Sequence, residues 1–184
     1  VVARGLRRQA QRRTLGRRLA GGYVKLSRHE RGMSFAERCG LHSREREAAC
    51  EQLVLQVEAS GIELIRLGWC DLHGVVRGKT IVASQLRQAL ANGIGMVSTL
   101  LLKDSSDRTA FKVFESGIEE TLPGFAGASN FTLMPDPASW HVLPWTEKTG
   151  WLQCQPFFVD GRIVPLDSRH VLPVSYTHLR AHET

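Results

Sequence analysis

Apolar residues recur every three or four positions between residues 43 and 60 of this 184-residue chain. They are Ala49, Cys50, Leu53, Val54 and Val57. Residues at this spacing share one face of an α-helix, which turns once every 3.6 residues. Ser43 can cap the start of the helix with its hydroxyl, and Gly61 can end it in a left-handed conformation. The pattern therefore predicts an amphipathic helix of about 17 residues.

Downstream of that helix, short apolar runs predict β-strands. The runs cover residues 62–70, 75–83, 96–102, 131–134, 140–143 and 151–159. Asp71-Leu72-His73-Gly74 separates the first two runs and has turn chemistry, with Gly74 free to adopt a positive φ, so we expect a hairpin. Asp160-Gly161 is a second turn signal. A second helix is expected to begin at Ser84 and to end at Asn92-Gly93.

Residues 103–130 are rich in Gly, Ser, Asp and Glu and are predicted to form a loop. A loop of this length is uncommon inside a compact domain, and such loops usually carry function. The element order is a helix, a hairpin, a second helix and then several strands. It predicts an α+β fold, in which a mixed sheet carries helices on one face.

The net charge of +6 is concentrated at the start of the chain. Residues 1–32 contain ten Lys/Arg and one Glu, so residues 33–184 carry a net charge of −3. We interpret residues 1–32 as a basic leader, either disordered or non-native. The alternatives are an arm that binds nucleic acid or a membrane surface and a mitochondrial targeting helix. The mildly acidic body argues against nucleic acid as a partner.

The cysteines give no sign of a zinc or redox site, because none of the four has Cys-x-x-Cys spacing. We expect reduced cysteines in a cytoplasmic protein. No apolar run approaches the ~18–20 residues that a membrane helix needs, so no membrane partner is expected. Residues 173–184 lack a hydrophobic period and resemble translated read-through of adapter DNA, which predicts a foreign tail.

Three sequence blocks occur in order along the chain. The first is Asp71-Leu72-His73-Gly74 with Arg77-Gly78-Lys79, the second is Met134-Pro135-Asp136-Pro137 with Pro144-Trp145, and the third is Asp160-Gly161-Arg162. Together they resemble the amino-terminal β-grasp domain of the glutamine synthetase and γ-glutamyl-amine ligase family, over residues 62–172. The resemblance implies an amino-terminal helical segment at 33–60, a β-grasp domain at 61–160 and the start of a catalytic domain at 161–172, with the chain truncated before that domain.

The same resemblance implies an ATP-dependent ligase that joins the γ-carboxylate of glutamate to ammonia or an amine through an acyl phosphate. ATP and Mg²⁺ or Mn²⁺ would be bound mainly by the missing domain, and no metal ligand is expected in this segment. The implied assembly is a homo-oligomer whose active sites are shared between subunits. We therefore predict that this chain alone is inactive. The alternative is a non-catalytic β-grasp interaction or assembly module.

In this family the amino-terminal domain contributes one loop to a neighbouring active site, with an aspartate near the ammonium position. By resemblance, Asp104 is the candidate amine-side carboxylate, and Ser105 and Ser106 support it; a turn-forming role for Asp104 is the alternative. The chain has Lys103-Asp104-Ser105-Ser106-Asp107-Arg108 where the best-known enzymes of the family place a phenylalanine, an aspartate and a glycine. This departure leaves the acceptor open between ammonia and an amine or polyamine. The candidate structural or interface residues are Asp71, Gly74, Arg77, Gly78, Lys79, Pro135, Asp136 and Trp145.

Overall fold

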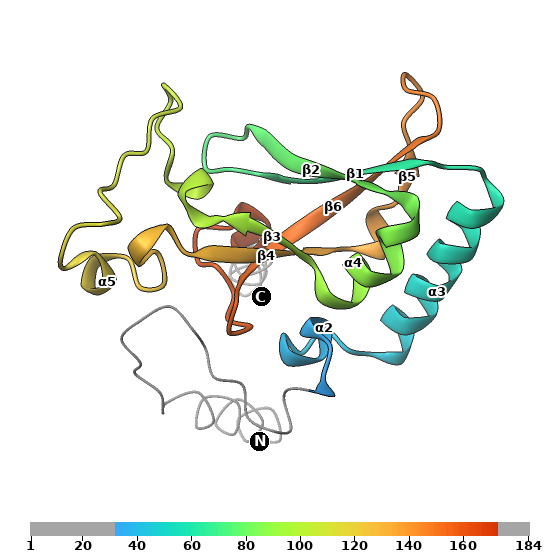
Figure 1. The fold of residues 1–184 in the computed structure, drawn as a ribbon, viewed down its shortest axis with the longest axis horizontal. Coiled ribbons are helices and arrows are strands. Elements are labelled where there is room, and N and C mark those ends of the chain that lie inside the picture. The colour runs from blue at the N-terminus through green and yellow to red at the C-terminus, as the bar shows by residue number, and fades with distance from the viewer. Residues whose placement is uncertain (1–31, 173–184) are drawn as a thin grey trace, which may run out of the picture.

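A computed structural model describes residues 32–172 and shows a mixed six-stranded sheet with short helices (Figure 1). The strands are β1 (Leu64–Cys70), β2 (Val76–Val82), β3 (Ile94–Val97), β4 (Asn130–Pro135), β5 (His141–Val142) and β6 (Thr149–Phe158). Their order is β2-β1-β6-β4-β3, with β5 paired to β6. Strands β1 and β6 are parallel, and the other neighbours are antiparallel. The predictions for the basic leader and the foreign tail concern residues 1–31 and 173–184, outside the described part.

The helices are α2 (Phe35–Arg38), α3 (Arg44–Ala59), α4 (Leu86–Asn92) and α5 (Ile118–Thr121). The helix predicted after Ser43 is α3, and the Ser43 hydroxyl accepts a hydrogen bond from the Arg46 N–H at 3.1 Å. The short helix α2 was not predicted, although Ser34 and Glu37 form the reciprocal capping box that marks a helix start. In Figure 1, α2, α3 and α4 lie together beside the sheet, and α5 lies at its other end.

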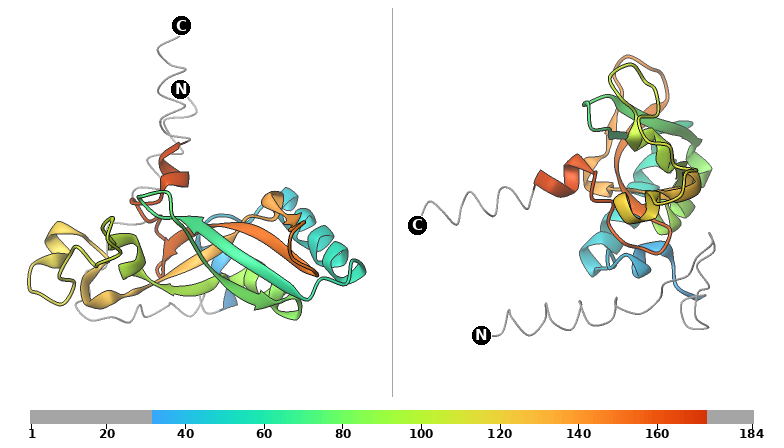
Figure 2. Two further views of the ribbon diagram at one scale, coloured as in Figure 1. Left: turned by 90° about the horizontal axis from the view of Figure 1, so that it is seen from above. Right: turned by 90° about the vertical axis from the view of Figure 1, so that its left-hand side faces the viewer.

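One hydrophobic core joins α3 and α4 to the sheet. Helix residues Leu53, Val57 and Leu86 belong to the same buried cluster as Ile65 and Leu152 of the central strands. In β1, Ile65, Leu67 and Trp69 are buried at alternate positions, as expected for a strand with one face on the core. The expected α+β fold, a mixed sheet with helices packed on it, is confirmed, and Figure 2 shows the twist of the sheet from two further sides.

Two local predictions were wrong. The apolar run 96–102 is not one strand, because β3 ends at Val97 and Ser98–Leu102 form a 3₁₀ turn that buries Leu101 and Leu102. Burial in a turn and burial in a strand produce the same run of apolar residues, so periodicity does not separate them. Ser84 does not cap the second helix, because it lies inside a 3₁₀ turn, Ala83–Gln85, and α4 begins at Leu86 without a side-chain cap.

The segment after β6 packs onto the sheet domain. Phe158 and Arg162 close the predicted Asp160-Gly161 turn through a 2.8 Å backbone hydrogen bond. Val164 is fully buried in the main core, and Asp167 is 1% exposed. Asp167 accepts the His170 N–H, and burial raises the pKa of its carboxyl. Residues 161–167 therefore contribute to the stability of this domain.

The Gly78→Ala substitution is expected to lower the free energy of unfolding by about 1–3 kcal/mol. A β-carbon at Gly78 would lie 2.0 Å from the backbone carbonyl oxygen of Leu67 on the adjacent strand, which cannot move without disturbing the β1–β2 pairing. Gly95→Ala is the matched control, because a β-carbon there meets no atom within 4 Å. Urea unfolding would measure both, and an equal loss in the two variants would contradict the steric explanation.

Candidate active-site loop

The candidate loop follows the 3₁₀ turn Ser98–Leu102 and projects at the upper left of Figure 1. It begins with a bridge between Lys103 and Thr109, and the backbone N–H of Asp104 donates to Arg108 O at 2.8 Å. The Oδ1 atom of Asp104 accepts hydrogen bonds from the N–H groups of Ser106, at 2.8 Å, and Arg108, at 3.0 Å. The carboxylate of Asp104 therefore closes the loop that carries it.

This geometry shows a turn-forming role for Asp104, which was the alternative reading of the residue. Its second oxygen, Oδ2, has no hydrogen bond or ion pair within residues 32–172. Asp104 is half-buried, whereas Ser105 and Ser106 are exposed at the tip of the loop. A carboxylate fixed through one oxygen presents the other in a defined direction, so both roles are compatible. The catalytic role of Asp104, Ser105 and Ser106 stays a prediction.

The turn of the β1–β2 hairpin is built around a buried carboxylate. Asp71 is 3% exposed, and its Oδ1 accepts the N–H groups of His73, at 2.9 Å, and Val75, at 3.0 Å. Arg77 Nε donates to Asp71 Oδ2 at 2.7 Å. Burial by itself would raise the pKa of Asp71, but the Arg77 hydrogen bond and the two backbone donors outweigh it and lower the pKa. Gly74 completes the turn with a φ of 76°.

The guanidinium of Arg77 joins the hairpin to the candidate loop. Its Nη2 donates to Asp107 Oδ1 at 2.7 Å, while its Nε donates to Asp71. This hydrogen bond lowers the pKa of Asp107. Asp107 adopts a left-handed φ of 60°, which aspartate tolerates better than most residues. The sequence reasoning missed Asp107; its signal was a second aspartate three residues after Asp104.

Two further side chains of the hairpin reach the same part of the chain. His73 Nε2 lies 2.9 Å from Lys103 O, and Lys79 Nζ donates to Gly95 O at 2.7 Å. Strands β2 and β3 stand at opposite ends of the sheet order, so the Lys79 contact shows that the sheet curls back on itself. The Lys103 ammonium also donates to Asp107 O at 3.0 Å within the loop. The first motif block therefore holds the loop and the strand before it.

The other predicted residues lie elsewhere. Pro135 is buried at the end of β4, and its carbonyl accepts from Arg46 of α3 at 2.9 Å. Asp136 caps the turn Pro137–Ser139 through the Ala138 N–H and forms an ion pair with Arg169. Trp145 is 72% exposed in the β5–β6 connection, a segment that lies at the opposite end of the sheet from the candidate loop in Figure 1. The structure brings together the first block and the loop, but not the second block.

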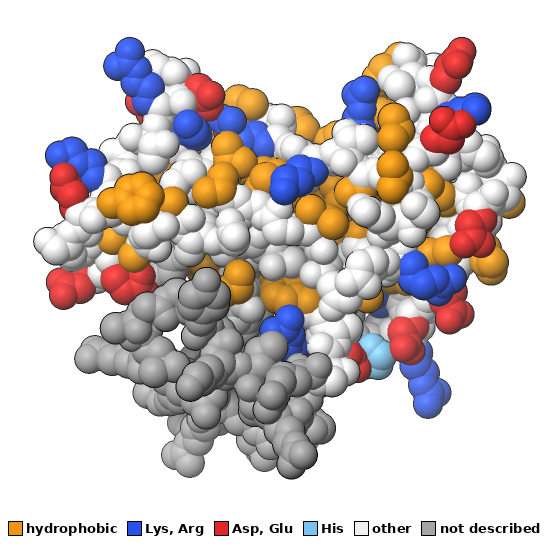
Figure 3. Space-filling model, in the orientation of Figure 1, with side chains coloured by type: hydrophobic (Ala, Val, Ile, Leu, Met, Phe, Trp, Pro, Cys, Tyr) orange, Lys and Arg blue, Asp and Glu red, His pale blue; other side chains and the backbone are white. Residues whose placement is uncertain are grey.

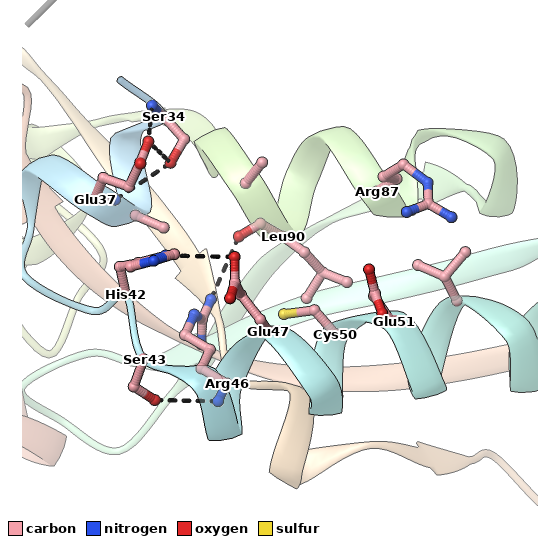
Figure 4. A pocket seen from close by; sticks show the side chains of 13 residues that line it. Ser34, Glu37, His42, Ser43, Arg46, Glu47, Cys50, Glu51, Arg87 and Leu90 are labelled. Carbon is pink, nitrogen blue, oxygen red and sulfur yellow. Dashed lines mark hydrogen bonds and ion pairs between the residues drawn. The ribbon is translucent and has the colours of Figure 1, made fainter. Parts of the chain in front are cut away.

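A cavity of about 300 Å³ lies between α2, α3 and α4 (Figure 4). Glu47 and Glu51 stand one helical turn apart on α3, with Cys50 between them and Arg87 of α4 across from them. The cavity was not predicted from the sequence. It shares no lining residue with the candidate loop or the hairpin that holds it.

Charges and possible metal ligands are dispersed over the described part. On the face shown in Figure 3, Lys/Arg side chains are interspersed with Asp/Glu. Within residues 32–172, no group of three or more His, Cys, Asp or Glu residues could hold a metal ion. The same residues include no helix long and apolar enough to cross a membrane. All four cysteines are free, and burial raises the pKa of the Cys154 thiol to about 12.

Comparisons with known proteins agree with this fold. The chain is 26% identical to the γ-glutamylanilide synthase of Acinetobacter sp over 144 residues, which are 76% of the chain and 29% of that protein. It is 30% identical to the glutamate–isopropylamine ligase of Pseudomonas sp over 117 residues, 63% of the chain and 24% of that protein. It is 29% identical to the glutamine synthetase of Mycolicibacterium smegmatis over 128 residues, 66% of the chain and 24% of that protein. No protein-family model matches the chain.

A solved GmaS/ADP complex resembles the structure with a TM-score of 0.53 and 25% identity, over 71% of this chain and 26% of that one. The curled mixed sheet with its helices has the β-grasp-like architecture expected from the sequence, and the GmaS structure shares it over the matched part. The chain is similar to members of the glutamine synthetase family over most of its length, and this similarity is consistent with the amino-terminal domain of that family. It spans between a fifth and a third of the length of these relatives.

Proposed function

We propose that this chain is the amino-terminal part of an ATP-dependent ligase that joins the γ-carboxylate of glutamate to ammonia or an amine. The observation that carries the proposal is the candidate loop, in which Asp104 is fixed through Oδ1 and keeps Oδ2 available. A carboxylate so held can attract a cationic amine and take a proton when the amine becomes a nucleophile. Two relatives support this chemistry, because their names specify amide formation with aniline and ligation of isopropylamine.

The proposed reaction has a part that the described residues do not supply. Phosphorylating a carboxylate with ATP requires divalent cations that neutralise the phosphates. Residues 32–172 contain no cluster suited to a metal, so they do not fit Mg²⁺ or Mn²⁺. We propose that ATP and the cations are bound by other parts of a full-length protein. In a homo-oligomer, the loop around Asp104 would close over the active site of a neighbouring subunit, a proposal supported by its projection from the sheet in Figure 1.

The experiment compares this 184-residue chain with the full-length product of its gene. Each is supplied with ATP, Mg²⁺, glutamate and either ammonia, isopropylamine or aniline, and amide and ADP formation are measured. We expect activity from the full-length protein and none from the chain alone. Amide formation by the chain alone would show that the chemistry lies within it. An inactive full-length protein that still assembles would favour the non-catalytic assembly module.

A further inference from the structure

The first motif block connects two aspartates that are far apart in the sequence. Arg77 donates from Nε to Asp71 and from Nη2 to Asp107, both at 2.7 Å, and Asp107 lies 30 positions from Arg77. Asp71 is itself anchored by two backbone N–H groups of the hairpin turn. The Arg77 side chain is 18% exposed, and the two carboxylates raise the pKa of its guanidinium. One end of this bridge is therefore fixed in the fold.

The other end of the bridge meets the loop at Asp107, which is hydrogen-bonded to the residue that closes the loop. The Asp107 N–H donates to Asp104 O at 3.0 Å, and the Asp107 carbonyl accepts from Lys103 Nζ. The left-handed φ of Asp107 turns the chain so that Arg108 N–H reaches Asp104 Oδ1. Asp107 thus lies between Ser106 and Arg108, the two residues whose N–H groups hold Asp104 Oδ1, so a shift of Asp107 would move both donors. Planar guanidinium groups suit this task, because their donors have fixed directions.

We infer that Arg77 and Asp107 are positioning residues that set the geometry of the amine-binding carboxylate Asp104. This inference rests on the proposed function, since Asp104 must serve the amine. The charged pair acts through Asp104 and does not itself touch the substrate. The resulting site is specific for a cationic or proton-donating acceptor, whose affinity depends on how precisely the loop is held. The inference gives Arg77 of the Arg77-Gly78-Lys79 block a role in the active-site loop in addition to its role in the stability of the sheet.

Two variants separate the ion pair from the backbone conformation. Asp107→Gly removes the carboxylate but accepts a positive φ without strain, and Asp107→Asn keeps the shape but loses the charge. In the 184-residue chain, hydrogen exchange of the Ser106 and Arg108 amides should become about tenfold faster in Asp107→Gly and less so in Asp107→Asn. Glu115→Gln, which breaks an exposed ion pair with Lys112 in the same long loop, is the matched control and should leave both rates unchanged. Unchanged rates in Asp107→Gly would overturn the inference.

Salt provides a readout that a purely structural contribution would not show. Asp107 is 68% exposed, so raising ionic strength should weaken its pairing with Arg77 and accelerate exchange in the wild type but not in Asp107→Gly. In the full-length protein, Asp107→Gly should raise the KM for the amine about tenfold while leaving the KM for glutamate unchanged. If hydrogen exchange in the loop became faster but the KM for the amine stayed unchanged, the positioning role of Asp107 would be refuted. A full-length wild type without ligase activity would refute the proposed function, whereas the exchange data would still report on the bridge.

Discussion

Replacing Asp104 with asparagine in the full-length protein is expected to lower kcat/KM for the amine about 100-fold or more. Asparagine keeps a side-chain oxygen that can accept the N–H groups of Ser106 and Arg108, so the loop should stay closed. It removes the negative charge that would attract a cationic amine and the base that would take its proton. Steady-state kinetics with varied amine, at saturating ATP and glutamate, measures the loss.

The alanine variant at position 104 distinguishes the loop-closing hydrogen bonds of Asp104 from the effect of its negative charge. Asp104→Ala removes both the loop-closing acceptor and the charge, so its loss should equal or exceed that of Asp104→Asn. Hydrogen exchange at Arg108 should accelerate only in the alanine variant, since only there is the acceptor gone. Glu115→Gln is the control for removing a carboxylate from the same loop. Wild-type kinetics in both Asp104 variants would leave the residue with its turn-forming role alone.

Local structure was predictable from the sequence where a short residue pattern is compatible with only one backbone conformation. Ser43 caps α3 because its hydroxyl reaches an N–H three residues ahead, and Gly93 ends α4 with a φ of 66°. Gly74 likewise takes the positive φ that the hairpin turn needs. Each of these depends on neighbours within a few positions. By contrast, Leu101 and Leu102 are buried in a turn whose shape depends on tertiary packing, so their apolar run was misread as a strand.

The candidate site was predictable only in part, because its geometry comes from long-range contacts. The motif block and the loop were both selected from the sequence, but nothing in either segment shows that Arg77 reaches Asp107. The contact follows from the curl of the sheet, which also places Lys79 against Gly95. Such pairs are fixed by the parallel β1–β6 alignment and the antiparallel β4 and β3 beside it. A residue type and its spacing give candidates, and topology decides which of them meet.

Removing the Arg77 guanidinium is expected to be the most destabilising of these changes. In Arg77→Met, Asp71 would remain 3% exposed without its cation, and breaking such a buried pair costs about 3–5 kcal/mol. The loss should depend on pH. In the wild type the pKa of Asp71 is lowered, so its ionised form stabilises the fold above about pH 4, and this contribution is lost as the pH falls through the folded pKa. In the variant the Arg77 hydrogen bond no longer opposes the effect of burial, so the pKa of Asp71 should be higher than in the wild type, and the difference in stability between the proteins should shrink from pH 7 toward pH 3.

The double variant Asp71→Asn with Arg77→Met tests whether the cost comes from the unpaired charge. An amide at position 71 can still accept the His73 and Val75 N–H groups but needs no counterion. The double variant should therefore be more stable than Arg77→Met alone at pH 7. Such a result would show that the effects of the two residues on stability are coupled. Arg66→Met, on the neighbouring strand and exposed, is the control for losing an arginine from this sheet. Urea unfolding at pH 7 and pH 4 measures all four proteins. If Arg77→Met and the double variant were equally destabilised at both pH values, the cost would lie in lost packing around the arginine and not in the buried charge of Asp71.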